Sequence, residues 1–224
     1  MEISPIIVSV KTALVSIAVT FFLGLAAAYG VERIQNRKVQ VICDGLLTLP
    51  LVLPPTVAGF FLLYLFGVKR PLGRFFLELF DIKIAFSWQA TVLAAVVISF
   101  PLMYRSARGA LQQVDVNLLY AGRTLGMSEW RIFWEVWFPN ALSGILSGGI
   151  LAFARGLGEF GATAMIAGNI AGETRTLPLA VYSAVAAGDM EEAYQYVWIL
   201  VLISFVVVTG MNAVTHGFQK YNRR

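Results

Sequence analysis

The protein is 224 residues long, with 58% hydrophobic residues and only 13% charged ones. About a quarter of an average soluble domain is charged, so this composition excludes a soluble globular domain. It also excludes a disordered chain, which requires few apolar and many charged residues. The single Cys and single His exclude an internal disulfide framework and a histidine-based metal cluster. The sequence therefore predicts an integral membrane protein.

Five uncharged runs are long enough to cross a bilayer, which requires about 20 mostly apolar residues in a helix. In chain order they are Thr12–Val31, Gly45–Val68, Ile84–Tyr104, Val136–Ala154 and Ala193–Gln219. In the second run, Pro50, Pro54 and Pro55 interrupt the backbone hydrogen bonds, so we expect a kink or a non-helical start there. A sixth run, Thr176–Gly188, has only 13 uncharged residues and contains Pro178. Its length predicts an interfacial or re-entrant helix rather than a span.

The predicted fold is thus all-α, a single membrane domain over residues 1–224 with about five transmembrane helices. Ten basic residues fall in one set of loops and six in the other, and the richer side of a polytopic protein faces the cytoplasm. The ten are Arg33, Arg37, Lys38, Arg105, Arg108, Arg123, Arg131, Lys220, Arg223 and Arg224. We expect a multi-pass protein of the plasma (inner) membrane, with its N-terminus outside and its C-terminus in the cytoplasm. The net charge of +4 indicates contact with the lipid bilayer rather than nucleic-acid binding.

The longest predicted cytoplasmic segment, about 109–139, has the pattern of two short helices joined by a hinge. Four residues recur at i, i+3, i+4 and i+7, which predicts one face of the first helix: Val116, Leu119, Tyr120 and Arg123. Gly126 lies in the hinge, and Ser128 followed by Glu129 favours the start of a second helix. A unit of this kind, held between two spans, predicts a knob that another protein can grip.

An aromatic stripe follows the hinge at the same helical spacing: Trp130, Phe133, Trp134 and Trp137. Tryptophans of this kind are typical of an anchor at the membrane interface. Pro139 is predicted to end or kink the helix where the fourth span begins.

In this loop the chain resembles permease subunits of binding-protein-dependent ABC importers. Their EAA loop has the pattern E-A-A-x3-G-x9-I-x-L-P, matched in register by Tyr120, Ala121, Gly122, Gly126, Val136, Phe138 and Pro139. Two departures from it matter, since Tyr120 stands in place of Glu and Gly122 in place of the second Ala. The resemblance implies a type I importer permease in which these residues, with Arg123, form the ATPase-coupling loop.

Further segments resemble the molybdate permeases of that family: Leu49–Gly59, Ala85–Trp88, Ser99–Leu102, Arg123–Gly126, Phe153–Thr163 and Gly172–Pro178. The resemblance implies a homodimer, an ABC ATPase subunit that binds ATP and Mg, and an extracytoplasmic oxyanion-binding protein. It implies import of molybdate or a similar tetrahedral oxyanion, with no enzyme activity, metal or cofactor in this chain. A tungstate or sulfate permease of the same architecture is an alternative. An integral-membrane enzyme would need paired carboxylates or His within the spans.

Arg155 and Glu159 are the ionisable residues beside the fourth span, where an unpaired charge is costly. Their i, i+4 spacing predicts one helix face on which each neutralises the other. Two interpretations stay open, a structural ion pair and direct guidance of the anion by Arg155. Ser99 and Thr163 are candidate neutral donors along a pathway or gate. In the same region, Gly144 and Gly148 predict close helix packing.

Overall fold

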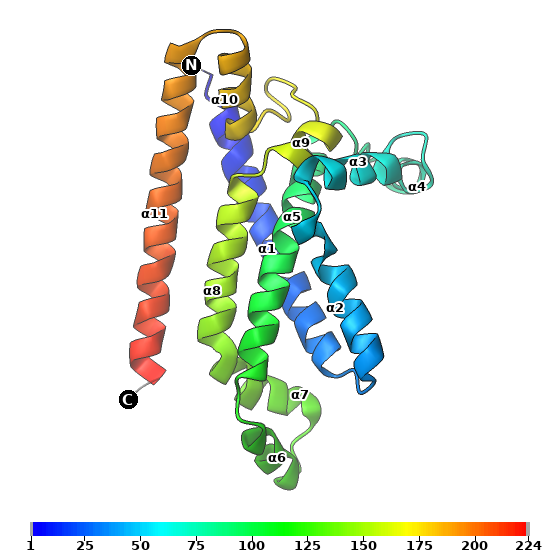
Figure 1. Ribbon diagram of the computed structural model, residues 1–224, viewed down its shortest axis with the longest axis vertical. Coiled ribbons are helices and arrows are strands. Elements are labelled where there is room, and N and C mark those ends of the chain that lie inside the picture. The colour runs from blue at the N-terminus through cyan, green and yellow to red at the C-terminus, as the bar shows by residue number, and fades with distance from the viewer. Residues whose placement is uncertain (1, 223–224) are drawn as a thin grey trace.

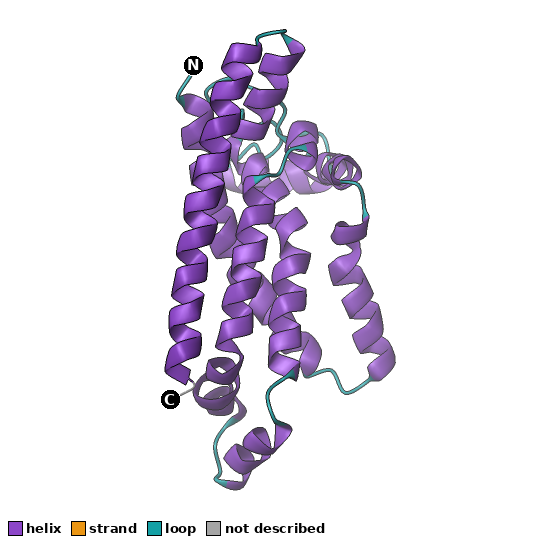
Figure 2. Ribbon diagram, turned by 60° about the vertical axis from the view of Figure 1, so that its left-hand side comes forward, coloured by secondary structure: helices purple, strands orange, loops and turns teal. Residues whose placement is uncertain are grey.

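The computed structural model describes residues 2–222, which form helices joined by short loops and contain no strand (Figure 1, Figure 2). The helices are α1 Ser4–Glu32, α2 Arg37–Val52, α3 Pro55–Phe66, α4 Pro71–Phe80, α5 Trp88–Gln112, α6 Val116–Thr124, α7 Glu129–Ile132, the π-helix η1 Phe133–Trp137, α8 Phe138–Leu157, α9 Gly161–Ile166, α10 Leu177–Ala186 and α11 Met190–Asn222. The predicted all-α fold is confirmed. Arg223 and Arg224, which entered the charge count, lie outside the described residues.

Four helices are long and apolar enough to cross a membrane: α1, α5, the continuous stretch Glu129–Leu157, and α11 as far as Met211. They run side by side along the long axis of the molecule (Figure 1). A fifth crossing is possible only if α2 and α3, which are bent by 110° at a short break, count as one broken span. The prediction of about five spans is therefore confirmed, with the second of them broken.

The break between α2 and α3 follows from two consecutive prolines. Leu53 has an extended backbone with ψ 139°, because the residue before a proline is pushed out of the helical region. Pro54 is also extended, and Pro55 occupies the first turn of α3, where its missing N–H costs nothing. Pro50 stays inside α2. The predicted non-helical start is thus confirmed at Pro54–Pro55.

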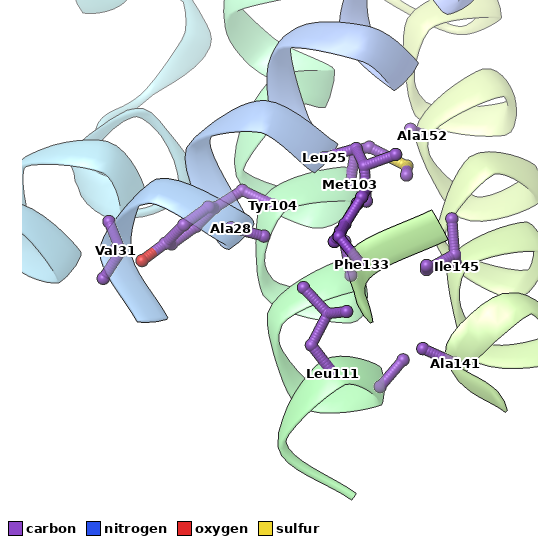
Figure 3. Packing of buried hydrophobic residues seen from close by; sticks show 12 residues of the cluster. Leu25, Ala28, Val31, Met103, Tyr104, Leu111, Phe133, Ala141, Ile145 and Ala152 are labelled. Carbon is purple, nitrogen blue, oxygen red and sulfur yellow. The ribbon is translucent and has the colours of Figure 1, made fainter. Parts of the chain in front are cut away.

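The core lies between α1, α5 and α8. Met103 and Tyr104 of α5 are completely buried there, next to Leu25 of α1 and Ile145 of α8 (Figure 3). Gly144 brings α8 close to α5, since a Cβ atom on it would stand 2.6 Å from the Cβ of Ala110. The close packing predicted from the small residues of the fourth span is confirmed.

The short run Thr176–Gly188 forms α10, which is too short to span a bilayer. It stands beside the first turns of α11, at the end of the molecule that holds the N-terminus (Figure 1). Leu177 donates its amide to the Ser9 hydroxyl of α1, 2.6 Å away, and packs with Tyr196 of α11. The helix is therefore part of the bundle. The opposite end carries α6, α7 and the last described turns of α11 (Figure 1).

Candidate coupling loop and ion pair of the fourth span

Both short helices of the predicted loop are present, and each begins at a polar cap. The Asp115 carboxylate accepts from the Asn117 amide at 2.9 Å and starts α6. The Ser128 hydroxyl accepts from the Arg131 amide at 3.3 Å and starts α7. Such caps satisfy the free amides of a first helical turn. The predicted helix–hinge–helix unit and the cap at Ser128 are confirmed.

The hinge depends on Gly126, whose φ of +76° lies in the left-handed region. This conformation favours glycine, because a side chain there meets the following carbonyl group. It allows the Gly126 and Met127 amides to donate to the carbonyls of Arg123 and Gly122, at 3.0 and 3.1 Å. The turn holds Leu125 at the tip of the loop with 81% of its surface exposed. The hinge therefore exposes the large apolar side chain of Leu125 at the surface of the loop.

The first helix of the loop buries only one side of the predicted face. Leu119 and Gly122 are its buried residues, whereas Val116 and Tyr120 are exposed. Gly122 packs on α7, where a Cβ atom would stand 3.1 Å from Cγ1 of Ile132. The i, i+3, i+4, i+7 pattern covers a wide arc of a helix, and only the Leu119 side of that arc meets the protein.

The four residues of the predicted aromatic stripe form one continuous series of ring contacts, and the part of it at Phe133–Trp137 is a π-helix. A π turn holds more residues than an α turn and rotates the side chains that follow it. Phe133 is buried, and the Trp137 indole donates to the Leu111 carbonyl at 2.8 Å, while Trp130 and Trp134 stay exposed. Residues Glu129–Leu157 are helical without interruption, so Pro139 does not end the helix. The stretch bends near Pro139, because α7 lies across the direction of α8 (Figure 1).

Glu129 joins the loop to α1. Its Oε1 accepts from Nε of Arg123 at 2.7 Å, and its Oε2 accepts from Nη2 of Arg33 at 3.0 Å. The hydrogen bond to Glu129 raises the pKa of the Arg123 guanidinium above its ordinary value. Arg33 follows the last turn of α1, so a single carboxylate connects α1, α6 and α7. Sequence analysis treated Glu129 only as a favourable first-turn residue and did not find this connection.

A second polar cluster was also missed, at the same end of α1. Arg108 of α5 binds Oε1 of Glu32 and Oδ1 of Asp44, each at 2.6 Å, and the Tyr104 hydroxyl donates to Asp44 at 2.8 Å. The cluster ties α2 to α1 and α5, although α2 buries none of its residues. The i, i+4 spacing of Tyr104 and Arg108 was the signal available in the sequence.

Arg155 and Glu159 form the predicted ion pair, with Nη1 and Oε2 2.7 Å apart. The side chain of Glu159 is 2% exposed and that of Arg155 is 32% exposed. The prediction of one helix face is wrong, because α8 ends at Leu157 and Glu159 lies in the break before α9. Its other oxygen, Oε1, accepts from the Ala162 amide at 2.7 Å. Glu159 therefore pairs with the last turn of α8 and caps the first turn of α9.

The two neutral candidates, Ser99 of α5 and Thr163 of α9, are both buried. The Ser99 hydroxyl pairs with that of Thr20 in α1 at 3.1 Å and donates to the Ala95 carbonyl. It faces Gly156, one residue after Arg155. Thr163 belongs to α9, beyond the Glu159 cap. The structure thus brings Ser99 near the last turn of α8, within the packing of α1, α5 and α8.

A bundle of membrane-length helices with one broken span and a helical loop at one end is the fold of an ABC importer permease. The protein is similar to a chain of the inward-facing MetNI methionine ABC transporter, with a TM-score of 0.75 and 16% identity over 96% of this chain and 94% of that one. The profile of the family of binding-protein-dependent transport system inner membrane components matches residues 20–223. The chain belongs to this family.

Two relatives are similar over most of their length. The molybdenum transport system permease protein ModB of Haemophilus influenzae is 41% identical over 86% of this chain and 83% of its own. The putative molybdenum transport system permease protein YvgM of Bacillus subtilis is 39% identical over 92% of this chain and 90% of its own. These similarities extend well beyond the loop.

Proposed function

We propose that the protein is the permease subunit of an importer that carries molybdate, or a similar tetrahedral oxyanion, into the cytoplasm. The observation that carries this proposal is the similarity to molybdenum transport permeases over nearly the whole chain. A permease of this class needs no catalytic residue of its own. Its energy comes from ATP, hydrolysed with Mg on a partner ABC ATPase. A second copy of the chain and an extracytoplasmic oxyanion-binding protein complete the importer.

The unit α6–hinge–α7 is the proposed ATPase dock. Two capped helices, a glycine hinge and an exposed apolar tip at Leu125 support this role, and α7 leads directly into the membrane-length stretch Glu129–Leu157. The motif residues have two roles there. Gly122 and Gly126 shape the unit, and Val136, Phe138 and Pro139 lie where it joins α8, while Tyr120, Ala121 and Arg123 lie on α6.

We further propose that the N-terminus lies outside the cell and the C-terminus in the cytoplasm. The N-terminus lies at one end of the molecule, and α6, α7 and the last described turns of α11 lie at the other (Figure 1). This arrangement agrees with the larger number of basic residues that the sequence places on that side of the membrane, including Arg33, Arg105 and Arg131. An ATPase docked on α6 and α7 then works on the cytoplasmic face.

The test is transport by the reconstituted complex. The permease, its partner ATPase and the binding protein are assembled in proteoliposomes, and molybdate uptake is measured by elemental analysis with and without ATP. ATP-dependent uptake of molybdate that excess sulfate does not suppress is the expected result. Uptake of sulfate alone would assign the protein to the sulfate alternative. Absence of ATP-dependent uptake for molybdate, tungstate and sulfate would contradict the proposal.

A further inference from the structure

We propose that Glu129 is a positioning residue that transmits movement of the ATPase dock to the first membrane helix. The inference rests on the proposed docking role of α6 and α7, and it adds the route by which their displacement reaches the spans. It concerns a residue at a position that the family motif leaves unspecified.

Glu129 holds three elements together through both of its carboxylate oxygens. Arg123 donates to it twice, from Nε at 2.7 Å and from Nη2 at 3.3 Å. Arg33 donates to Oε2 at 3.0 Å. A guanidinium that binds both oxygens of a carboxylate sets its orientation as well as its position. The geometry therefore fixes α6 relative to α7 and fixes both relative to the end of α1.

The other carboxylates of the loop act within their own helices. Asp115 caps α6, and Glu135 accepts at 2.7 Å from Arg131, four residues earlier in the continuous helical stretch Glu129–Leu157. Position 120, which carries Glu in the family pattern, is Tyr in this chain. Among the described hydrogen bonds of segment 109–139, the carboxylate that bridges separate elements is that of Glu129.

Few apolar contacts attach α6 to the rest of the protein. Its buried residues are Leu119 and Gly122, and the hinge that follows exposes Leu125. A helix held by so small an apolar surface moves relative to its neighbours unless polar bonds fix it. A push on α6 therefore reaches the membrane helices through α7 and through the bonds of Glu129.

The contacts of Arg33 link the displacement of α6 and α7 to the end of α1. Its guanidinium lies 4.9 Å from the centre of the Tyr29 ring, one turn earlier in α1, and that ring packs on Phe133 at 4.5 Å. Glu32, the last residue of α1, is bound to Arg108 of α5. The end of α1 is thus connected to the dock on one side and to the central helix α5 on the other.

The experiment removes the charge of Glu129 and keeps its shape. Glu129→Gln is introduced into the full complex of permease, ATPase and binding protein, with Glu135→Gln as the matched control, since Glu135 is also exposed and also pairs with an arginine at 2.7 Å. Three quantities are measured: the ATPase that co-purifies, the stimulation of ATP hydrolysis by loaded binding protein, and molybdate uptake.

Glu129→Gln is expected to keep the co-purified ATPase while stimulation and uptake fall at least about fivefold, the lower range of coupling between sites. Glu135→Gln stays within about twofold of the parent, because its pair with Arg131 joins two residues of one continuous helical stretch and links no other helix. Arg33→Gln should reproduce the loss, and the double variant Arg33→Gln with Glu129→Gln should lose no more than either single one, because both remove the same link.

Two results would overturn the inference. Equal behaviour of Glu129→Gln and Glu135→Gln would show that the bridge carries no coupling. Loss of co-purified ATPase in Glu129→Gln would make Glu129 a docking contact rather than a positioning residue. Failure of the parent protein to bind any ATPase would instead contradict the proposed function, so the two ideas fail by different measurements.

Discussion

Gly59 of α3 lies against the backbone of Ala162 in α9, so closely that a Cβ atom on Gly59 would stand 2.7 Å from the Ala162 Cα atom. The helix that follows the proline break thus packs directly on the helix that follows the break after α8. The close neighbours of Gly59 include the Ala162 carbonyl oxygen at 2.8 Å, which a rotamer change does not move. The two broken segments depend on each other for their position.

Gly59→Ala is therefore expected to destabilise the protein by about 1–3 kcal/mol, the usual cost of overpacking. Thermal unfolding in detergent measures this change. Gly45→Ala in α2 is the control, because a Cβ atom there meets no heavy atom within 4 Å. The control should gain about 0.5–1 kcal/mol from a better helix former. Equal melting temperatures for Gly59→Ala and the parent would contradict the proposed contact between α3 and α9.

Gly126→Val should disturb the loop without affecting membrane insertion. A β-branched residue at the left-handed φ of Gly126 (+76°) costs about 1–2 kcal/mol or more. The hinge then changes shape, and ATPase co-purification and uptake should fall together.

Gly126→Asn distinguishes the effect of backbone strain from the effect of adding a side chain. Asparagine tolerates left-handed conformations far better than valine does. It should retain most of the ATPase that the parent retains. Full ATPase binding and uptake by Gly126→Val would refute the docking role of the hinge.

The sequence was a reliable guide where local chemistry alone decides the structure. Composition and run length predicted the membrane helices, because about 20 apolar residues without a charge have few other solutions. The helix cap at Ser128 and the glycine turn at Gly126 were equally predictable, since each depends on its own backbone geometry. The break at Pro54 and Pro55 belongs to the same class.

The sequence was a poorer guide where distant segments decide the structure. The aromatic spacing assumed α-helical turns, and the π turn at Phe133–Trp137 changed it. The bridge from Glu129 to Arg33 joins residues 96 positions apart, which no local pattern contains. Glu159 has its predicted partner although it lies beyond the end of the helix, because the long side chain of Arg155 reaches it there.

The orientation of the chain in the membrane can be tested with cysteines introduced one at a time, after the single native cysteine has been removed. In a Cys43→Ala background, Ile3→Cys and Leu125→Cys place a thiol at each end of the molecule, since both side chains are mostly exposed. An impermeant thiol reagent on intact cells should label Ile3→Cys and leave Leu125→Cys unlabelled until the membrane is opened. The reverse labelling would invert the proposed topology, and labelling of both would mean that the number of crossings is even.

Variants of the ion pair of Arg155 and Glu159 can distinguish a structural role of the pair from a role in transport. Arg155→Met leaves a carboxylate that is 2% exposed without its partner, and breaking a buried pair in this way costs about 3–5 kcal/mol. Glu159→Gln leaves Arg155, which is 32% exposed, rather than a 2% exposed carboxylate without its partner, and it keeps an acceptor for the Ala162 amide. It should therefore cost less, about 1–3 kcal/mol. Assembled protein, measured by size-exclusion chromatography, should fall further in Arg155→Met than in Glu159→Gln.

The double variant Arg155→Met with Glu159→Gln removes both charges and keeps the cap on α9. We expect it to recover assembly and ATP-dependent uptake together, because the buried carboxylate that the single arginine variant strands is gone. Recovery of assembly without uptake, in the presence of loaded binding protein and ATP, would show that Arg155 acts on the anion itself. A single Arg155→Met variant that assembles normally but does not transport would lead to the same conclusion, because the guanidinium would then be needed for transport and not for the fold.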